Sequence, residues 1–184
     1  AHLARVLTKT ALDSKSKIEH IVWREKLAIA SVRKLAKSPE LDSLIQKCGQ
    51  NIDTARKRAF SRIDETLSFF GKRIGLTYPA KIEETASEKQ AKKIGPKRLF
   101  KGSRDPDTLK KLLGEEEFRW YEEMAEKDTK FPIKRAEILN FMNGERTLYD
   151  IIRAVSAEYE EIPIEHALKI IKDLEKTKLI AQAT

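Results

Sequence analysis

Two long runs of regularly spaced apolar residues constrain this chain more than any other feature. Within residues 3–36 and 41–74 an apolar or small residue recurs every three or four positions, with Glu25 the one exception, and this spacing gives an α-helix one apolar face. Each run covers 33 residues in nine steps, about 3.67 residues per turn, which is typical of nearly straight helices. The two faces consist of Leu3, Leu7, Ala11, Ser14, Ile18, Ile21, Glu25, Ile29, Val32 and Ala36, and of Leu41, Ile45, Cys48, Ile52, Ala55, Ala59, Ile63, Leu67, Phe70 and Ile74.

The two runs predict a long antiparallel helical hairpin over residues 1–75. Ser38-Pro39 separates them, and Pro39 suits the first position of a helix that Ser38 caps. The weak helix formers Asp13, Ser14 and Ser16 favour a break or a fresh start in the first helix. Each arm is then about 50 Å long at 1.5 Å per residue.

The hairpin carries more apolar surface than two helices can cover, because each helix has a single neighbour. We therefore expect it either to form a homodimer or to dock on a catalytic domain of a longer parent chain. The first residue is Ala1 rather than Met, and we expect the chain to be a piece of such a protein. The candidate partner-contact residues are Trp23, Leu27, Ala30, Phe60 and Phe69.

The distribution of charge places a boundary near residue 100. Residues 1–102 hold 23 Lys and Arg against 11 Asp and Glu, a formal +12, whereas residues 103–184 hold 14 against 18, a formal −4. The Pro and Gly residues and the Lys and Glu run of residues 76–106 predict a basic linker, with one exposed helical stretch over 82–94.

Residues 107–184 predict a small helix-turn-helix-like domain, which makes the whole chain nearly all-α. A helix over 107–126, capped by Asp105 or Asp107 and interrupted at Gly114, precedes one that starts at Pro132. Thr147 and Asp150 have the spacing of a capping box, and Pro163 starts the last helix. Residues 179–181 are the one predicted strand. Three helices with a short turn, followed by a strand, are typical of a winged-helix core.

The same residues resemble a known type of module. Asn143-Gly144-Glu-Arg-Thr147-Leu148 between two helices, with Leu174 to Ile180 as a leucine-rich end, resembles small winged-helix accessory modules. Such units resemble the carrier-type modules of peptide-modifying systems and the C-terminal accessory region of two-zinc aminopeptidases. Lys178 departs from the pattern, which usually has Gly at that helix end.

The aminopeptidase resemblance implies a division of labour with residues outside this chain. In that family a helical dimerisation segment lies between the catalytic domain and the tail, in agreement with the hairpin. The zinc ligands would lie upstream of Ala1. The resemblance therefore implies a non-catalytic assembly or protein-interaction region of a zinc-dependent peptidase.

Nothing in the sequence indicates chemistry within the chain itself. His2, His20 and His166 lie far apart without a metal-ligand spacing, and Cys48 lies on an apolar face, where we expect a buried structural thiol. We therefore expect no catalytic residue, no metal site and no cofactor here. No apolar run approaches the roughly 20 residues of a membrane span, and the single cysteine excludes a disulfide framework, so we expect a cytoplasmic protein.

Nucleic-acid binding is the alternative function, because basic residues cluster in the hairpin and the linker and could neutralise phosphates. The start of the last helix, where a helix-turn-helix contacts DNA, is instead acidic. The candidate nucleic-acid contacts are Arg56, Lys57, Arg58, Arg62, Lys92, Lys93, Lys97, Arg98 and Lys101.

Overall fold

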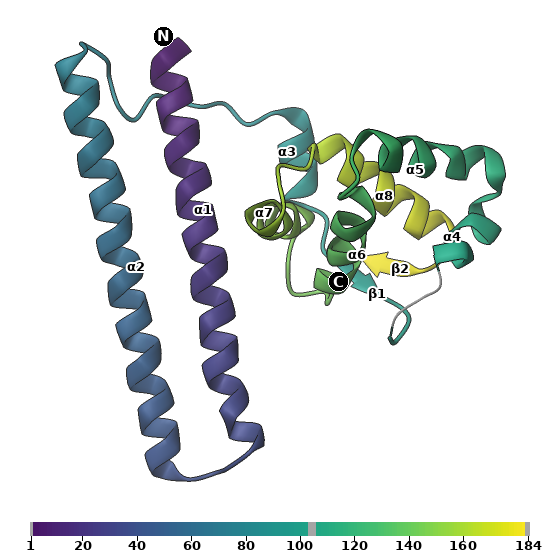
Figure 1. The fold of residues 1–184 in the computed structure, drawn as a ribbon, viewed down its shortest axis with the longest axis horizontal. Coiled ribbons are helices and arrows are strands. Elements are labelled where there is room, and N and C mark those ends of the chain that lie inside the picture. Colours follow the sequence, from purple (N-terminus) through teal and green to yellow (C-terminus); the bar gives the residue numbers. More distant parts are fainter. Residues whose placement is uncertain (1, 103–105, 183–184) are drawn as a thin grey trace. The chain divides into compact units, whose positions relative to one another are not determined.

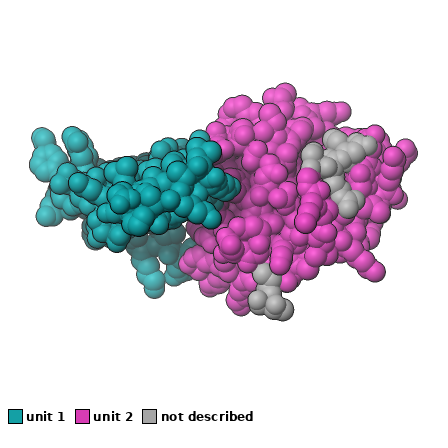
Figure 2. Space-filling view, turned by 90° about the horizontal axis from the view of Figure 1, so that it is seen from below, with its two compact units in different colours: residues 1–83 teal, residues 84–184 magenta. Residues whose placement is uncertain are grey.

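The computed structural model describes residues 2–102 and 106–182, and these form two compact units that comprise residues 1–83 and 84–184 (Figure 2). Helices make up nearly all of the regular structure, as the sequence predicted. Among the described residues, no helix is both long enough and apolar enough to span a bilayer.

The first unit is a hairpin of two long helices, α1 (His2–Ser31) and α2 (Pro39–Arg73), with a short 3₁₀ turn at Val32–Lys34 (Figure 1). The predicted start of α2 is confirmed, because the Ser38 side chain accepts a hydrogen bond from the Leu41 amide and Pro39 occupies the first turn. The break expected at residues 13–16 does not occur. Helix propensities differ by only a few tenths of a kcal/mol there, less than the packing of α1 on α2 contributes.

The second unit consists of shorter helices. Gly114, at φ 85°, separates two of them at the predicted break. The Thr147–Asp150 capping box is present. Asp107 lies in the first turn of α4 rather than at its cap, and Asp105 lies outside the described residues. The helices are α3 (Ala86–Ala91), α4 (Pro106–Leu113), α5 (Glu115–Lys127), α6 (Phe131–Phe141), α7 (Leu148–Glu158) and α8 (Ile164–Lys176).

A two-stranded sheet corrects the expectation of a single strand. β1 (Pro96–Arg98) pairs antiparallel with β2 (Ile180–Gln182), with Pro96 opposite Gln182. The residues of β1 fall in the segment that the sequence predicted to be a linker. The helical stretch predicted over 82–94 is shorter in the structure, where it is α3, and its Ala91 is buried rather than exposed. Residues 84–102 thus belong to the second unit, where Ala91 and Pro96 are buried and the Ile94 carbonyl accepts a hydrogen bond from the Leu148 amide.

The apolar core of the second unit is built mainly from α6, α7 and α8, with Tyr121 from the middle of α5. A polar group lies inside it: Tyr121 donates a 2.8 Å hydrogen bond to Asp173, and Lys169 donates another at 2.8 Å. Burial, followed by the hydrogen bond to Asp173, raises the pKa of the Tyr121 phenol above its ordinary value of 10.0. The largest fully buried residues are Ile138, Met142, Leu148, Ile151, Ile170, Leu174, Val155 and Pro96.

We expect Asp173→Ala to lower the free energy of unfolding by about 2–3 kcal/mol, because it leaves the Tyr121 hydroxyl buried without an acceptor and Lys169 without its partner. Asp173→Asn keeps an acceptor and should cost less. Urea unfolding of the full chain measures both. The exposed Glu123→Ala is the control and should change the value by less than about 0.5 kcal/mol. An equally small effect of Asp173→Ala would contradict the structure of this cluster.

Lys178 adopts a left-handed conformation, at φ 56°, where α8 ends and the chain enters β2. A side chain with a Cβ is strained there, and glycine is not. We expect Lys178→Gly to raise the free energy of unfolding by up to about 1 kcal/mol. Lys172→Gly, inside α8 and also exposed, should lower it by about 1 kcal/mol. Thermal unfolding of both variants checks the sign, and destabilisation by Lys178→Gly would contradict this geometry.

Candidate association surface

The hairpin has no apolar core of its own. Its buried residues among 2–83 are small or polar, so no large apolar side chain in this part of the chain is buried. Twelve of the fifteen exposed large apolar residues of the described chain also belong to it. These twelve are Leu3, Val6, Leu12, Ile21, Leu27, Val32, Leu35, Leu44, Phe69, Phe70, Ile74 and Ile82.

A shallow groove of about 420 Å³ runs between α1 and α2 on one side of the hairpin. We call this side the open face. The floor of the groove is formed largely by small or apolar side chains, and Arg62 is its one charged lining residue. The lining residues are Thr10, Ala11, Ser14, Ile18, Ala59, Arg62, Ile63, Thr66 and Leu67.

The five predicted partner-contact residues do not form one patch. Trp23 is half-buried and stacks on His20, with ring centroids 6.0 Å apart, and Ala30 is half-buried as well. Leu27 is exposed but lies nine residues after Ile18, which places it on the opposite side of α1 from the groove.

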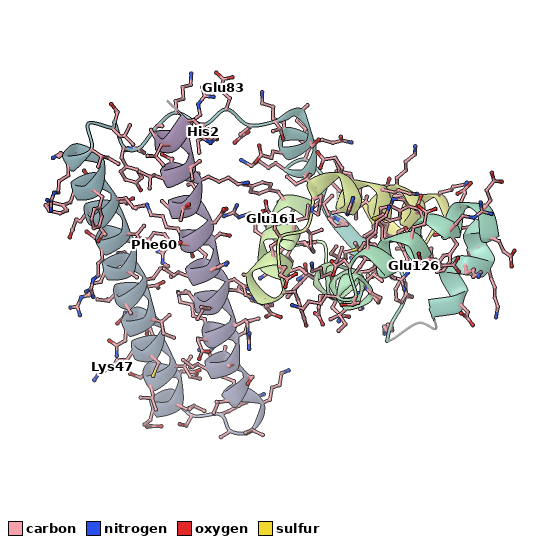
Figure 3. The ribbon with its side chains drawn as sticks, turned by 45° about the horizontal axis from the view of Figure 1, so that its top comes forward. His2, Lys47, Phe60, Glu83, Glu126 and Glu161 are labelled. Atoms are coloured by element: carbon pink, nitrogen blue, oxygen red, sulfur yellow. The ribbon has the colours of Figure 1, made fainter. Side chains whose placement is uncertain are left out.

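The two phenylalanines among these candidates also differ. Phe60 is half-buried on the side of α2 toward α1 (Figure 3), with the Lys15 ammonium 5.6 Å from its ring centroid. Phe69 is 56% exposed and packs edge-on against Phe70. Phe69 and Leu27 are thus the two candidates that are exposed rather than half-buried.

Ion pairs across the hairpin fix the position of α1 along α2. Lys15 contacts Asp64 at 2.6 Å, Lys26 contacts Asp53 at 2.7 Å, and Arg56 of α2 contacts Glu19 of α1 at 2.5 Å. The hydrogen bond from Lys15, assisted by one from the Tyr78 hydroxyl, holds the pKa of Asp64 below its ordinary value of 3.8. Burial and the contact with Asp64 raise the pKa of Tyr78 to about 12.

The net charge of the chain resides in the hairpin. Residues 1–83 hold 17 Lys and Arg against 9 Asp and Glu, a formal +8, whereas residues 84–184 hold 20 against 20. Four of the nine hairpin carboxylates are already engaged by cations of the hairpin itself. The hairpin as a whole is therefore net basic, while its groove has Arg62 as its one charged lining residue.

The candidate nucleic-acid residues are distributed over both units and are partly engaged within them. Arg56 pairs with Glu19, and Lys92 pairs with Glu84 while its ammonium lies 4.8 Å from the Tyr149 ring centroid. Arg98 is half-buried, with its guanidinium 5.8 Å from the Phe100 ring centroid. The remaining candidates are exposed side chains: Lys57, Arg58 and Arg62 on α2, and Lys93, Lys97 and Lys101 in the second unit.

The described residues bring no three His, Cys, Asp or Glu side chains together in a way that could hold a metal ion. Cys48 is half-buried rather than buried as the sequence predicted. It precedes the groove residue Ala59 by eleven residues, about three helical turns, and so lies on the groove side of α2. The thiol is not paired in a disulfide.

No protein-family model matches the chain, and neither a curated protein nor a solved structure matches it. The association surface therefore rests on the geometry of the hairpin. The groove was not predicted from the sequence, although small residues at Ala11, Ser14 and Ala59 within otherwise large apolar runs signal it.

We expect Asp64→Asn to make the hairpin less sensitive to acid. Because the folded-state pKa of Asp64 is lowered, its carboxylate stabilises the hairpin fully above about pH 4 and loses that contribution as the pH falls through the folded-state pKa. Hydrogen exchange of α1 and α2 amides between pH 7 and about pH 3 measures the effect. Glu65→Gln is the control, because the Glu65 carboxylate accepts a hydrogen bond from Ser61 of the same helix and not from a cation of α1. Identical acid profiles for Asp64→Asn and the parent chain would contradict this role.

Proposed function

We propose that the chain is a non-catalytic assembly region, in which the hairpin buries its apolar surface on another protein surface. One observation carries the proposal: among the described residues 2–83 no large apolar side chain is buried, while twelve are exposed. Following the resemblance in its second half, the larger protein is a zinc-dependent aminopeptidase whose metal ligands lie outside these residues.

The energetics support association. Fully burying one large aliphatic or aromatic side chain contributes roughly 1.5–3 kcal/mol, so covering the exposed half of one contributes on the order of 1 kcal/mol, and a partner gains this for each exposed residue that it covers. A hairpin that leaves this surface in water forgoes most of the stabilisation available to it.

The second unit completes the proposal as a winged-helix-like module that contacts protein. The succession of α6, α7 and α8 followed by β2 supports this assignment. Its two strands come from distant segments, 96–98 and 180–182, instead of from one hairpin. Within the described residues the unit therefore lacks the β-hairpin wing that reaches into DNA, which favours protein contact.

The nucleic-acid alternative has less support. Glu165 lies in the first turn of α8, where it would repel phosphate, and Lys169 and Lys176 of the same helix are paired with Asp173 and Glu117. The apolar groove also matches a protein side chain better than a phosphate backbone.

Sedimentation and dye binding of the chain test the proposal together. We expect either an oligomer, or a monomer that binds a fluorescent apolar dye and loses most of that binding when Ile21 and Phe69 are both changed to Gln. Both side chains are exposed, so the double variant should keep its helical circular dichroism. A well-folded monomer that binds no dye would contradict the assembly function.

A further inference from the structure

A second hollow of the hairpin, about 370 Å³ in volume, lies beside the first turns of α1. We call it the basic pocket. One wall is α1, and the other is the segment 81–83, which follows α2 along the chain. His2 belongs to the first wall and Glu83 to the second (Figure 3). None of the residues that line the basic pocket lines the groove of the open face.

The α1 wall presents three basic side chains in a row. His2, Arg5 and Lys9 all line the pocket, and successive members are three and four residues apart. This spacing places side chains next to each other along one side of a helix. All three side chains are exposed, so their polar groups are accessible to a ligand.

A buried threonine holds the opposite wall against α1. The Thr8 hydroxyl donates a 2.9 Å hydrogen bond to the Ala4 carbonyl and accepts one at 2.8 Å from the Ala80 amide. Thr8 is 6% exposed, so water competes little for these bonds. They bring Lys81, the next residue after Ala80, into the same pocket as Arg5. The positive charges thus come from two separate segments that the fold holds together.

The pocket concentrates positive charge. Arg5, Lys9 and Lys81 against Glu83 give it a formal +2 when His2 is counted as neutral. Within residues 2–102 and 106–182, neither Arg5 nor Lys81 takes part in an ion pair, whereas other cations of the hairpin bind carboxylates. Like charges held together repel each other, and a bound anion converts that repulsion into attraction.

The lining also indicates the chemical class of the anion. The guanidinium of Arg5 can donate two parallel hydrogen bonds to a phosphate, and the ammonium of Lys81 adds a point charge. A phosphate monoester carries a charge of about −1.5 to −2 at pH 7, which matches the formal charge of the pocket.

The same pocket has an apolar part. Val6 and Ile82 line it and are 43% and 40% exposed. An organic group that covers these side chains removes apolar surface from water, which inorganic phosphate cannot do. The volume of about 370 Å³ lies at the lower end of the range for small-molecule sites.

We propose that the basic pocket binds a small organic phosphate, with its phosphate at Arg5 and Lys81 and its organic group on Val6 and Ile82. This site goes beyond the proposed assembly function and does not depend on it. It also differs from the nucleic-acid alternative, because none of the basic residues predicted to contact nucleic acid lines the pocket.

Phenyl phosphate is a suitable probe, because it joins a phosphate monoester to one apolar ring. The full chain, labelled with ¹⁵N, is titrated with it in about 50 mM salt and followed by NMR. We expect saturable shifts of amides within residues 2–9 and 80–83. Inorganic phosphate should bind the same site more weakly, since it leaves the apolar part uncovered, and phenol should not shift these amides.

Charge-removing variants show whether the pocket itself binds the probe. Arg5→Gln and Lys81→Gln should each weaken the binding of phenyl phosphate at least about tenfold, because each removes a charge-assisted hydrogen bond. Lys17→Gln is the matched control, because it removes an exposed charge of α1 outside the pocket, and it should change the dissociation constant less than about twofold. All three side chains are exposed, so the variants should keep the helical circular dichroism of the parent.

Three results would overturn the site. Equal weakening by Arg5→Gln and Lys17→Gln would mean that only the overall charge of the hairpin attracts the probe. Phenyl phosphate shifts that do not saturate would mean that there is no defined site. Binding of the chain to vesicles that contain phosphatidic acid, without binding of soluble phenyl phosphate, would place the anion on a membrane surface.

Discussion

A helix with a single neighbour cannot hide a wide apolar face, and the rest of this structure depends on that constraint. In the second unit, several short helices surround one another and Ile138 and Leu148 are fully buried. In the hairpin, α1 and α2 meet along one edge, and ion pairs such as Lys15–Asp64 supply much of the specificity that a core would otherwise supply. Such exposed pairs contribute little stability but fix the register of the two helices, so the open face has a defined shape.

The features that the sequence predicted correctly are those determined within a few residues. Ser38 and Pro39 start α2 through one cap hydrogen bond, and Gly114 separates α4 from α5 through its left-handed backbone. β2 at residues 180–182 lies within one residue of the predicted strand. In each case the deciding interaction joins neighbours in the chain, so composition and spacing are enough to locate it.

The features that the sequence did not predict depend on residues far apart. β1 is three residues long, contains Pro96, and exists because a segment more than 80 residues away pairs with it. The groove depends on how the apolar stripes of α1 and α2 are rotated relative to each other. Neither stripe by itself determines that rotation. Trp23 follows the groove residue Ile18 by five residues, about 140° around the helix, so this predicted partner contact lies away from the groove.

The pairing of β1 with β2 also determines how the second unit would respond to mechanical load. Pro96 begins β1 and Gln182 ends β2, and these two residues lie opposite each other. Tension applied between the hairpin side of the chain and its far end would therefore peel the strands apart one hydrogen bond at a time instead of shearing all of them together. The β1–β2 sheet would therefore separate before the helices of the second unit unfold.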